Sequence, residues 1–301
     1  MSSPATAKDM QPSSISFRPR LEASLALDFV RDAATGETVL SASVQEPPLR
    51  VVRAFALEDG AALAHLHNVS GGLLGGDRLS LTVNVGAGAS VQLTTTGGTR
   101  IYRPRDGAPP TMQTNEIRVG ENALLEYVPD AIIPYAGARF AQRTRIELET
   151  GAGLFWWEVI APGREASGEV FAYERIDMRT DVTANGRLIA AENMQLDPRR
   201  SALRSIARLG QYRYWATFYI CRVGLDSATW LAAEEHLREA ASELSRPGEM
   251  LWGISTLLAD GLVVRGLAVR GRDVLGGLHV LWSAAKQRLY GRAAVPPRKV
   301  H

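Results

Sequence analysis

The stretch Asn68–Pro104, NVSGGLLGGDRLSLTVNVGAGASVQLTTTGGTRIYRP, decides how the rest of this chain is interpreted. Four glycines between positions 71 and 76 surround two leucines and lead directly into Asp77. Glycine allows left-handed backbone conformations and the close approach of a neighbouring segment. From position 79 to 85 apolar and polar residues alternate, which is the period of a strand with one buried face. The stretch therefore predicts a glycine-shaped loop that feeds a strand.

The glycine spacing at 71–76 is also that of a phosphate-binding P-loop. A P-loop continues with a lysine that reaches phosphate and with a helix whose N-terminus receives the anion. Here Asp77 stands at the position of the lysine, and a strand is predicted to follow. Because a carboxylate would repel phosphate, we favour the alternative that these glycines shape a sharp crossing between sheets.

Length and composition exclude several classes of protein. With 301 residues and 46% hydrophobic side chains, the chain can bury the core of one large β domain or of two smaller domains. No apolar run approaches the roughly 18 residues of a membrane span, and the first 20 residues lack a secretory signal pattern. A net charge of +2 without a basic cluster gives no indication of nucleic-acid binding. We expect a cytoplasmic protein, and the single cysteine, Cys221, fits a reducing compartment.

A strand–turn–strand unit recurs three times in the N-terminal half. Its glycine-containing turns lie at 86–88, 120–122 and 151–153, at a nearly constant step. Such a period predicts stacked β layers built from hairpin-like units, either as a sandwich or as an irregular β-solenoid.

The chain divides into three predicted regions. Residues 1–16 have no apolar period and predict a disordered lead-in, and residues 17–200 predict a β-rich stacked-sheet region. Residues 201–301 predict a small β-α-β-β-α portion that packs on this region as one continuous unit. Its first helix is expected at Ser227–Leu244, with the first residue as N-cap, and its second at 272–290. The fold class is therefore mainly β with two C-terminal helices.

Two further segments carry polar residues of interest. Leu125–Ala138 contains two prolines and predicts an ordered loop, rather than a strand, that carries Glu126 and Asp130. His65 and His67 lie two residues apart on a predicted strand, so they share a face and could both bind a metal. No third ligand is near them in sequence, and a structural role for one of the two is the alternative.

Common catalytic motifs are missing from the sequence. There is no Gly-x-Ser-x-Gly nucleophile elbow and no His-Glu-x-x-His metal motif. The 32 acidic residues nevertheless leave a β-fold hydrolase with two facing carboxylates as a competing interpretation.

An ordered set of motifs resembles the urease accessory protein UreD family, which is called UreH in some bacteria. The likeness spans most of the chain. The motifs are Ser70–Asp77, Leu93–Thr95, Thr99–Arg103, Leu125–Ala138, Trp157–Val159, Gly163-Arg164 and Gly168–Phe171. The C-terminal Pro297-Arg298-Lys299-Val300 departs from the usual Pro-Arg-Ile-Trp of the family, which removes any contact made by that tryptophan.

The resemblance implies a function without catalysis. Members of the family bind urease apoprotein and, with UreF and the GTPase UreG, deliver nickel into its active site. The chain is therefore expected to be a urease maturation chaperone whose partners are the urease structural subunits, UreF and, through UreF, UreG. No cofactor is expected to be permanently bound, and nickel would pass in transit. Whether a homodimer forms within the accessory complex is left open.

An internal polar passage has been proposed as the route of the ion in this family. The matching metal-binding positions here are Asp77, Asp130 and Glu169, with Thr99 and Arg164 associated with them. Oxygen ligands hold a divalent first-row metal more weakly than thiolates or several imidazoles, so the ion can leave again. The alternative for each residue is a buried hydrogen-bonded or ion-paired group that holds the loops together.

Overall fold

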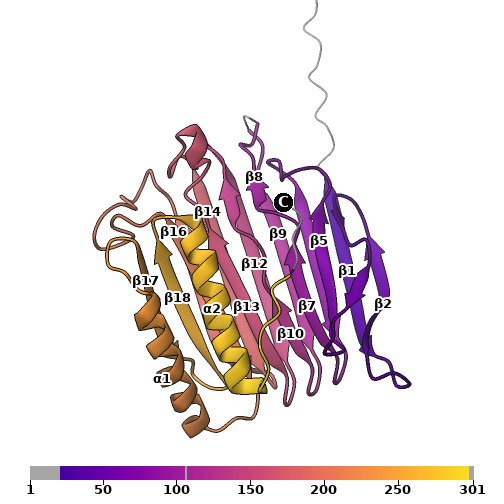
Figure 1. The fold of residues 1–301 in the computed structure, drawn as a ribbon. Coiled ribbons are helices and arrows are strands. Elements are labelled where there is room, and N and C mark those ends of the chain that lie inside the picture. Colours follow the sequence, from indigo (N-terminus) through magenta and orange to yellow (C-terminus); the bar gives the residue numbers. More distant parts are fainter. Residues whose placement is uncertain (1–20, 106, 298–301) are drawn as a thin grey trace, which may run out of the picture.

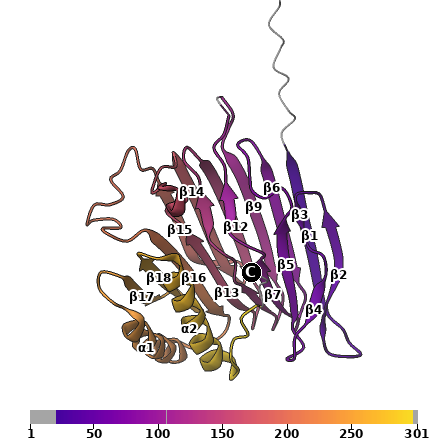
Figure 2. The ribbon, with the colours of Figure 1, turned by 45° about the horizontal axis from the view of Figure 1, so that its top comes forward.

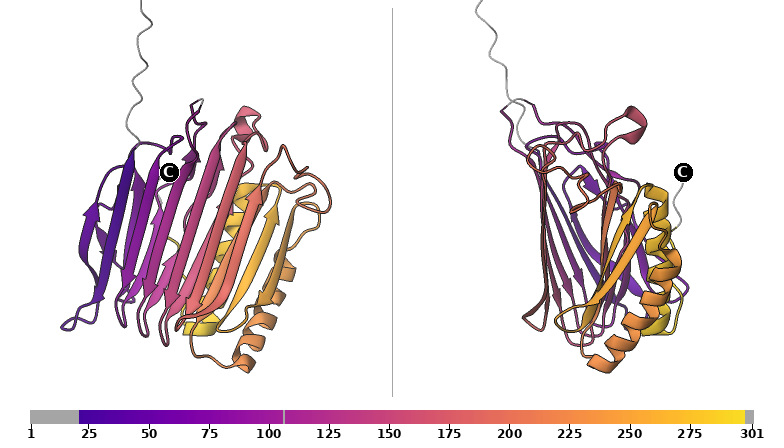
Figure 3. Two further views of the ribbon diagram at one scale, coloured as in Figure 1. Left: turned by 180° about the vertical axis from the view of Figure 1, so that it is seen from behind. Right: turned by 90° about the vertical axis from the view of Figure 1, so that its left-hand side faces the viewer.

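A computed structural model describes residues 21–105 and 107–297 (Figure 1). Two β-sheets stack face to face, and two helices lie on the outer face of one of them (Figure 3). The predicted mainly β fold with two C-terminal helices is confirmed. The predicted lead-in at 1–16 and the last three residues of the atypical tail lie outside the described residues.

The first sheet has seven strands within the described residues. In spatial order they are β15 (Arg187–Leu196), β14 (Arg175–Ala184), β12 (Arg139–Leu148), β9 (Thr111–Val119), β6 (Arg78–Val85), β1 (Glu22–Arg31) and β2 (Thr38–Gln45). From β14 to β1 neighbouring strands run parallel, and the two edge strands pair antiparallel.

The second sheet has eleven strands in the same part of the chain. Its main path is β17 (Met250–Thr256), β18 (Gly261–Ala268), β16 (Tyr214–Arg222), β13 (Gly153–Ile160), β10 (Leu124–Tyr127), β7 (Ser90–Thr95), β5 (Ala62–Asn68) and β3 (Leu49–Arg50). Three short strands pair at its margins: β4 (Ala54–Ala56), β8 (Thr99–Ile101) and β11 (Ile132–Pro134). The central strands β13, β10, β7 and β5 are parallel.

The three repeated units place their two strands in different sheets. β6, β9 and β12 lie in the first sheet, whereas β7, β10 and β13 follow them in the second. Each glycine turn therefore crosses between the sheets, and each strand pairs with the equivalent strand of the next unit rather than with its own partner in sequence. The turns stack closely, because a Cβ on Gly120 would lie 3.0 Å from the backbone nitrogen of Ala87. This arrangement is an irregular solenoid extended by antiparallel edge strands.

The helices lie where the sequence predicts them. α1 (Ser227–Leu244) has the predicted bounds, and α2 (Gly271–Tyr290) begins one residue earlier than expected. The predicted N-cap is wrong by one residue, because Asp226 is the N-cap and its Oδ1 accepts a hydrogen bond of 2.7 Å from the Thr229 N–H. A carboxylate at this position satisfies a helix N–H and complements the helix dipole. Both helices pack their apolar faces on the second sheet.

The segment Leu125–Ala138 is not wholly a loop. It contains most of β10 and all of β11, so the prediction of no strand is wrong for these residues. β10 pairs on one side with β7 and on the other with β13, which satisfies its backbone groups. The two prolines are tolerated because Pro129 follows β10 and Pro134 is the last residue of β11.

The two ends of the stacked sheets differ. Tight turns close one end, whereas the segments 68–77, 96–105, 107–110, 128–138, 161–174 and 197–213 gather at the other, which comes forward in Figure 2. We call this second end the long-loop end. No helix among the residues that the structure describes is long and apolar enough to cross a membrane.

Candidate functional site

The space between the two sheets holds two separate apolar clusters. One lies toward the turns and includes Ile117, Ile146 and Trp156. The other lies toward the long-loop end and includes Phe140 and Ile160. Between them, inward-facing positions from β9 to β15 in the first sheet are polar, whereas on β1 and β6 the apolar positions are continuous from Ala23 to Leu25 and from Leu79 to Leu81.

We call these polar side chains the polar belt. It consists of Gln113 and Asn115 on β9, Gln142 and Thr144 on β12, Glu158 on β13, Thr180 on β14, Glu192 on β15, and Thr217 and Arg265 on β16 and β18. Most are deeply buried, with 1% exposure for Asn115 and Thr144. Buried polar groups must be hydrogen-bonded or solvated, so a belt of this kind has to be matched internally.

Strand register assembles the belt as two rows. In the first sheet Asn115 is the register partner of Thr144, Thr144 of Thr180, and Thr180 of Glu192. In the second sheet Glu158 is opposite Thr217, and Thr217 is opposite Arg265. Parallel pairing aligns Asn115, Thr144 and Thr180. Antiparallel pairing adds Glu192 to this row and forms the second row, so polar residues far apart in sequence form continuous lines.

Hydrogen bonds link neighbouring members of the belt. The Gln113 amide donates to Asn115 Oδ1 at 3.0 Å, and the Asn115 amide donates to Thr144 Oγ1 at 3.0 Å. The Gln142 amide donates to Thr144 Oγ1 at 3.4 Å and also to the Glu158 carboxylate. The hydrogen-bonded chain thus leads from β9 to the carboxylate on β13.

Three adjoining cavities follow the belt. The first cavity, of about 240 Å³, and the second, of about 30 Å³, share Thr99, Gln113 and Tyr127 in their walls. The second shares Glu158 with the third, which has a volume of about 10 Å³ and also contacts Glu192. A polar cavity needs roughly 10–15 Å³ to hold a water molecule. The first two can therefore be hydrated, whereas the third is at the limit and would have to widen for an ion to pass.

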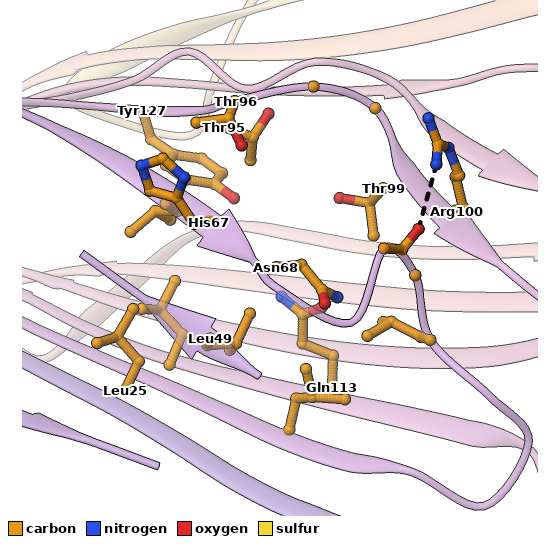
Figure 4. Close-up of a pocket in the computed structure, with 18 residues that line it drawn as sticks. Leu25, Leu49, His67, Asn68, Thr95, Thr96, Thr99, Arg100, Gln113 and Tyr127 are labelled. Carbon is orange, nitrogen blue, oxygen red and sulfur yellow. Dashed lines mark hydrogen bonds between the residues drawn. The ribbon is translucent and has the colours of Figure 1, made fainter. Parts of the chain in front are cut away.

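The glycine loop forms part of the wall of the first cavity (Figure 4). His67, Tyr127 and Thr99 face the hollow, and the Arg100 guanidinium donates a hydrogen bond of 3.5 Å to the Gly71 carbonyl. A Cβ on Gly72 would lie 2.3 Å from Cε2 of the Tyr102 ring. Glycine is required here because the segment after β8 packs directly against the loop.

Glu158 is a carboxyl group of the belt with a strongly raised pKa. Burial raises its pKa to about 7; the Gln142 amide opposes this effect, and the charge of Glu192 reinforces it. The Thr180 hydroxyl also donates to it, at 3.4 Å. No residue that the structure describes forms a salt bridge with Glu158. A buried carboxyl group without a cationic partner is costly to ionise.

This raised pKa predicts how stability depends on pH. Between the unfolded value of 4.5 and the folded value of about 7 the folded protein binds more protons, so stability should fall as pH rises through this interval. Glu158→Gln removes the titration and should stabilise the protein by about 3 kcal/mol above pH 7, with little effect near pH 4. Urea unfolding at several pH values measures this difference. A Glu158→Gln curve parallel to that of the wild type would contradict the prediction.

The belt reaches the surface at Glu192 and Arg265. Their side chains meet across the two sheets, with Arg265 Nη1 2.6 Å from Glu192 Oε1. The Tyr219 hydroxyl donates to Glu192 Oε2 at 2.6 Å. The Arg265 side chain is 49% exposed and that of Glu192 16%. This end of the belt therefore lies near solvent, at the open side of the sandwich between β15 and β18.

The structure separates the residues that the sequence grouped as a metal path. Thr99 lines the first two cavities, whereas Asp77 lies in the glycine loop, where its Oδ2 accepts a hydrogen bond of 2.8 Å from the Leu74 N–H. Burial raises the pKa of Asp77, and this hydrogen bond opposes the shift. Asp77 thus holds the loop that forms part of the cavity wall, and a metal-binding role for it stays a prediction.

Asp130 lies beside the first cavity. Its backbone N–H donates to Thr95 Oγ1 at 2.9 Å, and Thr95 lines that cavity. Its proposed metal-binding role stays a prediction.

Arg164 and Glu169 form an ion pair at the long-loop end. Arg164 Nε donates to Glu169 Oε2 at 2.8 Å, and its guanidinium lies 4.2 Å from the centre of the Tyr135 ring. The same Oε2 accepts the Ala136 N–H at 3.1 Å, and Arg164 lowers the pKa of Glu169. The pair ties two loops together, which is the structural alternative considered for these residues. Their transit role stays a prediction.

The two histidines occupy different surroundings. His65 packs edge-on against Phe55, with ring centres 6.1 Å apart, and His67 lines the first cavity. Among the residues that the structure describes, no group of three His, Cys, Asp or Glu side chains could hold a metal ion.

Sequence reasoning missed most of the belt. Glu158 falls within the Trp157–Val159 motif, whereas no motif in the sequence singles out Glu192 or Gln142. The available signal is the strand period: in β12, Phe140, Gln142, Thr144 and Ile146 fall on one face. A polar pair between apolar residues on an inward face marks the belt once the face is known.

The fold and the belt together define a stacked β protein with rows of buried polar side chains between its sheets. A sequence model of the UreD urease accessory protein family matches residues 21–301. The chain belongs to this family. Its members are accessory proteins rather than enzymes, so the competing interpretation as a hydrolase is set aside.

Relatives from distant organisms match almost the whole chain, and each is named urease accessory protein UreD. One from Herpetosiphon aurantiacus is 45% identical over 282 residues, 94% of this chain and 97% of the relative. Another from Cenarchaeum symbiosum is 34% identical over 91% and 95% of the two chains. A third from Pseudomonas fluorescens is 32% identical over 94% and 95%.

Proposed function

We propose that this chain assists urease maturation in the cytoplasm by passing nickel ions along the polar belt toward the urease apoprotein. The observation that carries the proposal is the line of adjoining polar cavities from the glycine loop to Glu158 and Glu192. The metal is cargo in this scheme, and no cofactor is permanently bound. The urease structural subunits, UreF and, through UreF, UreG are the proposed partners.

The chemistry of the belt suits transit better than storage. Its members offer amide, hydroxyl and carboxylate oxygens, which bind Ni²⁺ less tightly than thiolates or clustered imidazoles. The carboxylates Glu158 and Glu192 would supply the charged steps. Gln113, Asn115 and Thr144 would supply the neutral steps between the first cavity and Glu158. Weak ligands in sequence let an ion bind and then leave.

The presence of a carboxyl group at position 158 also supports a functional role. A carboxyl group whose pKa is raised by burial costs stability at neutral pH. Folding alone would favour glutamine or an apolar residue at this position. Costs of this kind concentrate at functional sites, because function requires the charge.

Affinity purification tests the proposed partners. The tagged full chain is expressed with a urease operon, and urease subunits, UreF and UreG are sought in the purified complex. Recovery of all three supports the scheme. Loss of UreG when UreF is deleted would indicate that UreG binds this chain through UreF. A chain that is recovered alone, under conditions in which urease is matured, would contradict it.

A further inference from the structure

The polar belt ends in a charge arrangement that the transit scheme alone does not require. Glu158 and Glu192 both border the third cavity, and the charge of Glu192 is close enough to raise the pKa of Glu158. One cation, the Arg265 guanidinium, pairs with Glu192 at 2.6 Å. Two carboxyl groups and one exchangeable positive charge therefore occupy the end of the belt.

The Arg265 side chain can move away from Glu192 without disturbing the other contacts of this carboxylate. The side chain is 49% exposed, and it also donates a long hydrogen bond of 3.5 Å to Thr217 Oγ1. Glu192, in contrast, is held by the Tyr219 hydroxyl at 2.6 Å as well as by Arg265. If the guanidinium swung into solvent, the carboxylate would keep its orientation and would lose its counter-charge.

A divalent cation is the chemical species that would replace this counter-charge. Oxygen-rich sites with carboxylates select hard or borderline divalent metals over monovalent groups. Glu158, Glu192, Thr180 and Thr217 line the third cavity together with four apolar or aromatic residues, so its side-chain oxygens come from two carboxyl groups and two hydroxyl groups. Its small volume fits a site that is closed while Arg265 is paired and opens when an ion arrives.

We propose that Arg265 is a displaceable counterion that closes the β15–β18 end of the polar belt, and that Ni²⁺ competes with it for Glu192. The inference rests on the proposed function, because it names the residue that controls one end of the same route. Arg265 is a positioning residue in this scheme. It balances the charge of Glu192 between ions and gives way when Ni²⁺ reaches the third cavity.

Binding of Ni²⁺ to the isolated full chain tests the inference by calorimetry or equilibrium dialysis. Arg265→Gln removes the competing charge, so Ni²⁺ should bind about tenfold more tightly than to the wild type. Arg265→Lys keeps a displaceable cation and should restore an affinity close to that of the wild type. Glu192→Gln/Arg265→Gln should lose the gain, since the carboxylate that both cations share is gone.

A matched control is available on the outer face of the first sheet. Arg179 pairs with Asp181 at 2.9 Å, away from the belt. Arg179→Gln should leave Ni²⁺ binding unchanged. Unchanged affinity in Arg265→Gln, or a gain that persists in the double variant, would overturn the inference. Glu192→Gln alone gives an independent check, because it should weaken Ni²⁺ binding, and unchanged binding would also overturn it.

The outcome is separable from that of the proposed function. The nickel content of matured urease reports on transit, whereas the affinity of the isolated chain reports on Arg265. If belt variants lower the nickel content and Arg265→Gln does not change affinity, transit stands and the counterion role fails. If Arg265→Gln tightens binding and belt variants leave nickel content unchanged, the cation site stands and the transit role fails.

Discussion

Urease that is matured with the Glu158→Gln variant should contain several-fold less nickel and show a proportional loss of activity. Glutamine keeps the size of the side chain and can still meet the Gln142 and Thr180 partners in part. It removes the negative charge at the step where the second and third cavities meet. A neutral amide oxygen is a much weaker ligand for Ni²⁺ than a carboxylate. Metal analysis of purified urease gives the result directly.

The control for this experiment is Glu147→Gln. Glu147 is on the outer face of the same sandwich, where its side chain is 59% exposed and pairs with Arg118 at 3.2 Å. Glu147→Gln removes the same charge without changing the belt, so the nickel content of the matured urease should stay at the wild-type level. Copurification with urease must be equal for both variants. A Glu158→Gln protein that binds urease normally and yields fully loaded enzyme would remove Glu158 from the route.

The same substitution should raise stability and lower function. Glu158→Gln relieves the cost of a buried carboxyl group at neutral pH, as argued from its raised pKa. A purely structural residue would not behave this way, because its replacement would leave partners unpaired and lower stability. Opposite signs in the two measurements would therefore distinguish a functional carboxylate from one that only holds the structure together.

Local sequence signals were sufficient for the helices. In α1 the apolar spacing places Trp230, Ala233 and Leu237 on the buried face, and its first and last residues were predicted correctly. The helix period is fixed by backbone geometry within one segment, so no distant partner is needed to recognise it. The N-cap was displaced by one residue because Asp226 and Ser227 are both good capping residues.

The polar belt depends on information that no single segment contains. Asn115, Thr144 and Thr180 are each separated by about thirty residues or more in sequence, and only parallel register brings them into one row. A shift of one residue would turn each to the opposite face of the sheet. The repeated glycine turns indicate stacked units, yet they do not say whether the two strands of a unit share a sheet. Unless it is known whether the two strands of a unit lie in one sheet, polar residues that face the space between the sheets cannot be distinguished from those that face outward.

A second group of buried charges lies outside the belt, under the helices. Lys286 on α2 and Glu126 on β10 are 1% and 2% exposed, and Lys286 Nζ lies 2.7 Å from Glu126 Oε1. The Trp282 indole donates to Glu126 Oε2 at 2.7 Å. The pair joins the C-terminal helix to the central strands of the second sheet. Both groups are fully surrounded by protein, so neither can be solvated if its partner is lost.

Lys286→Met should therefore destabilise the protein by about 3–5 kcal/mol, because it leaves the Glu126 carboxylate buried without a cation. Burial already raises the pKa of Glu126, and the lysine opposes this shift, so the variant should raise it further. A carboxyl group with a raised folded pKa loses stability as pH rises above its unfolded value. The deficit should thus be smaller at pH 5 than at pH 8, as measured by urea unfolding. The double variant Glu126→Gln/Lys286→Met should recover most of the loss of stability. The control is Arg238→Met, which breaks an exposed ion pair with Glu234 on α1. This control should change stability by about 0.5 kcal/mol or less. A loss for Lys286→Met as small as that control would show that the buried pair does not hold α2 to the sheet.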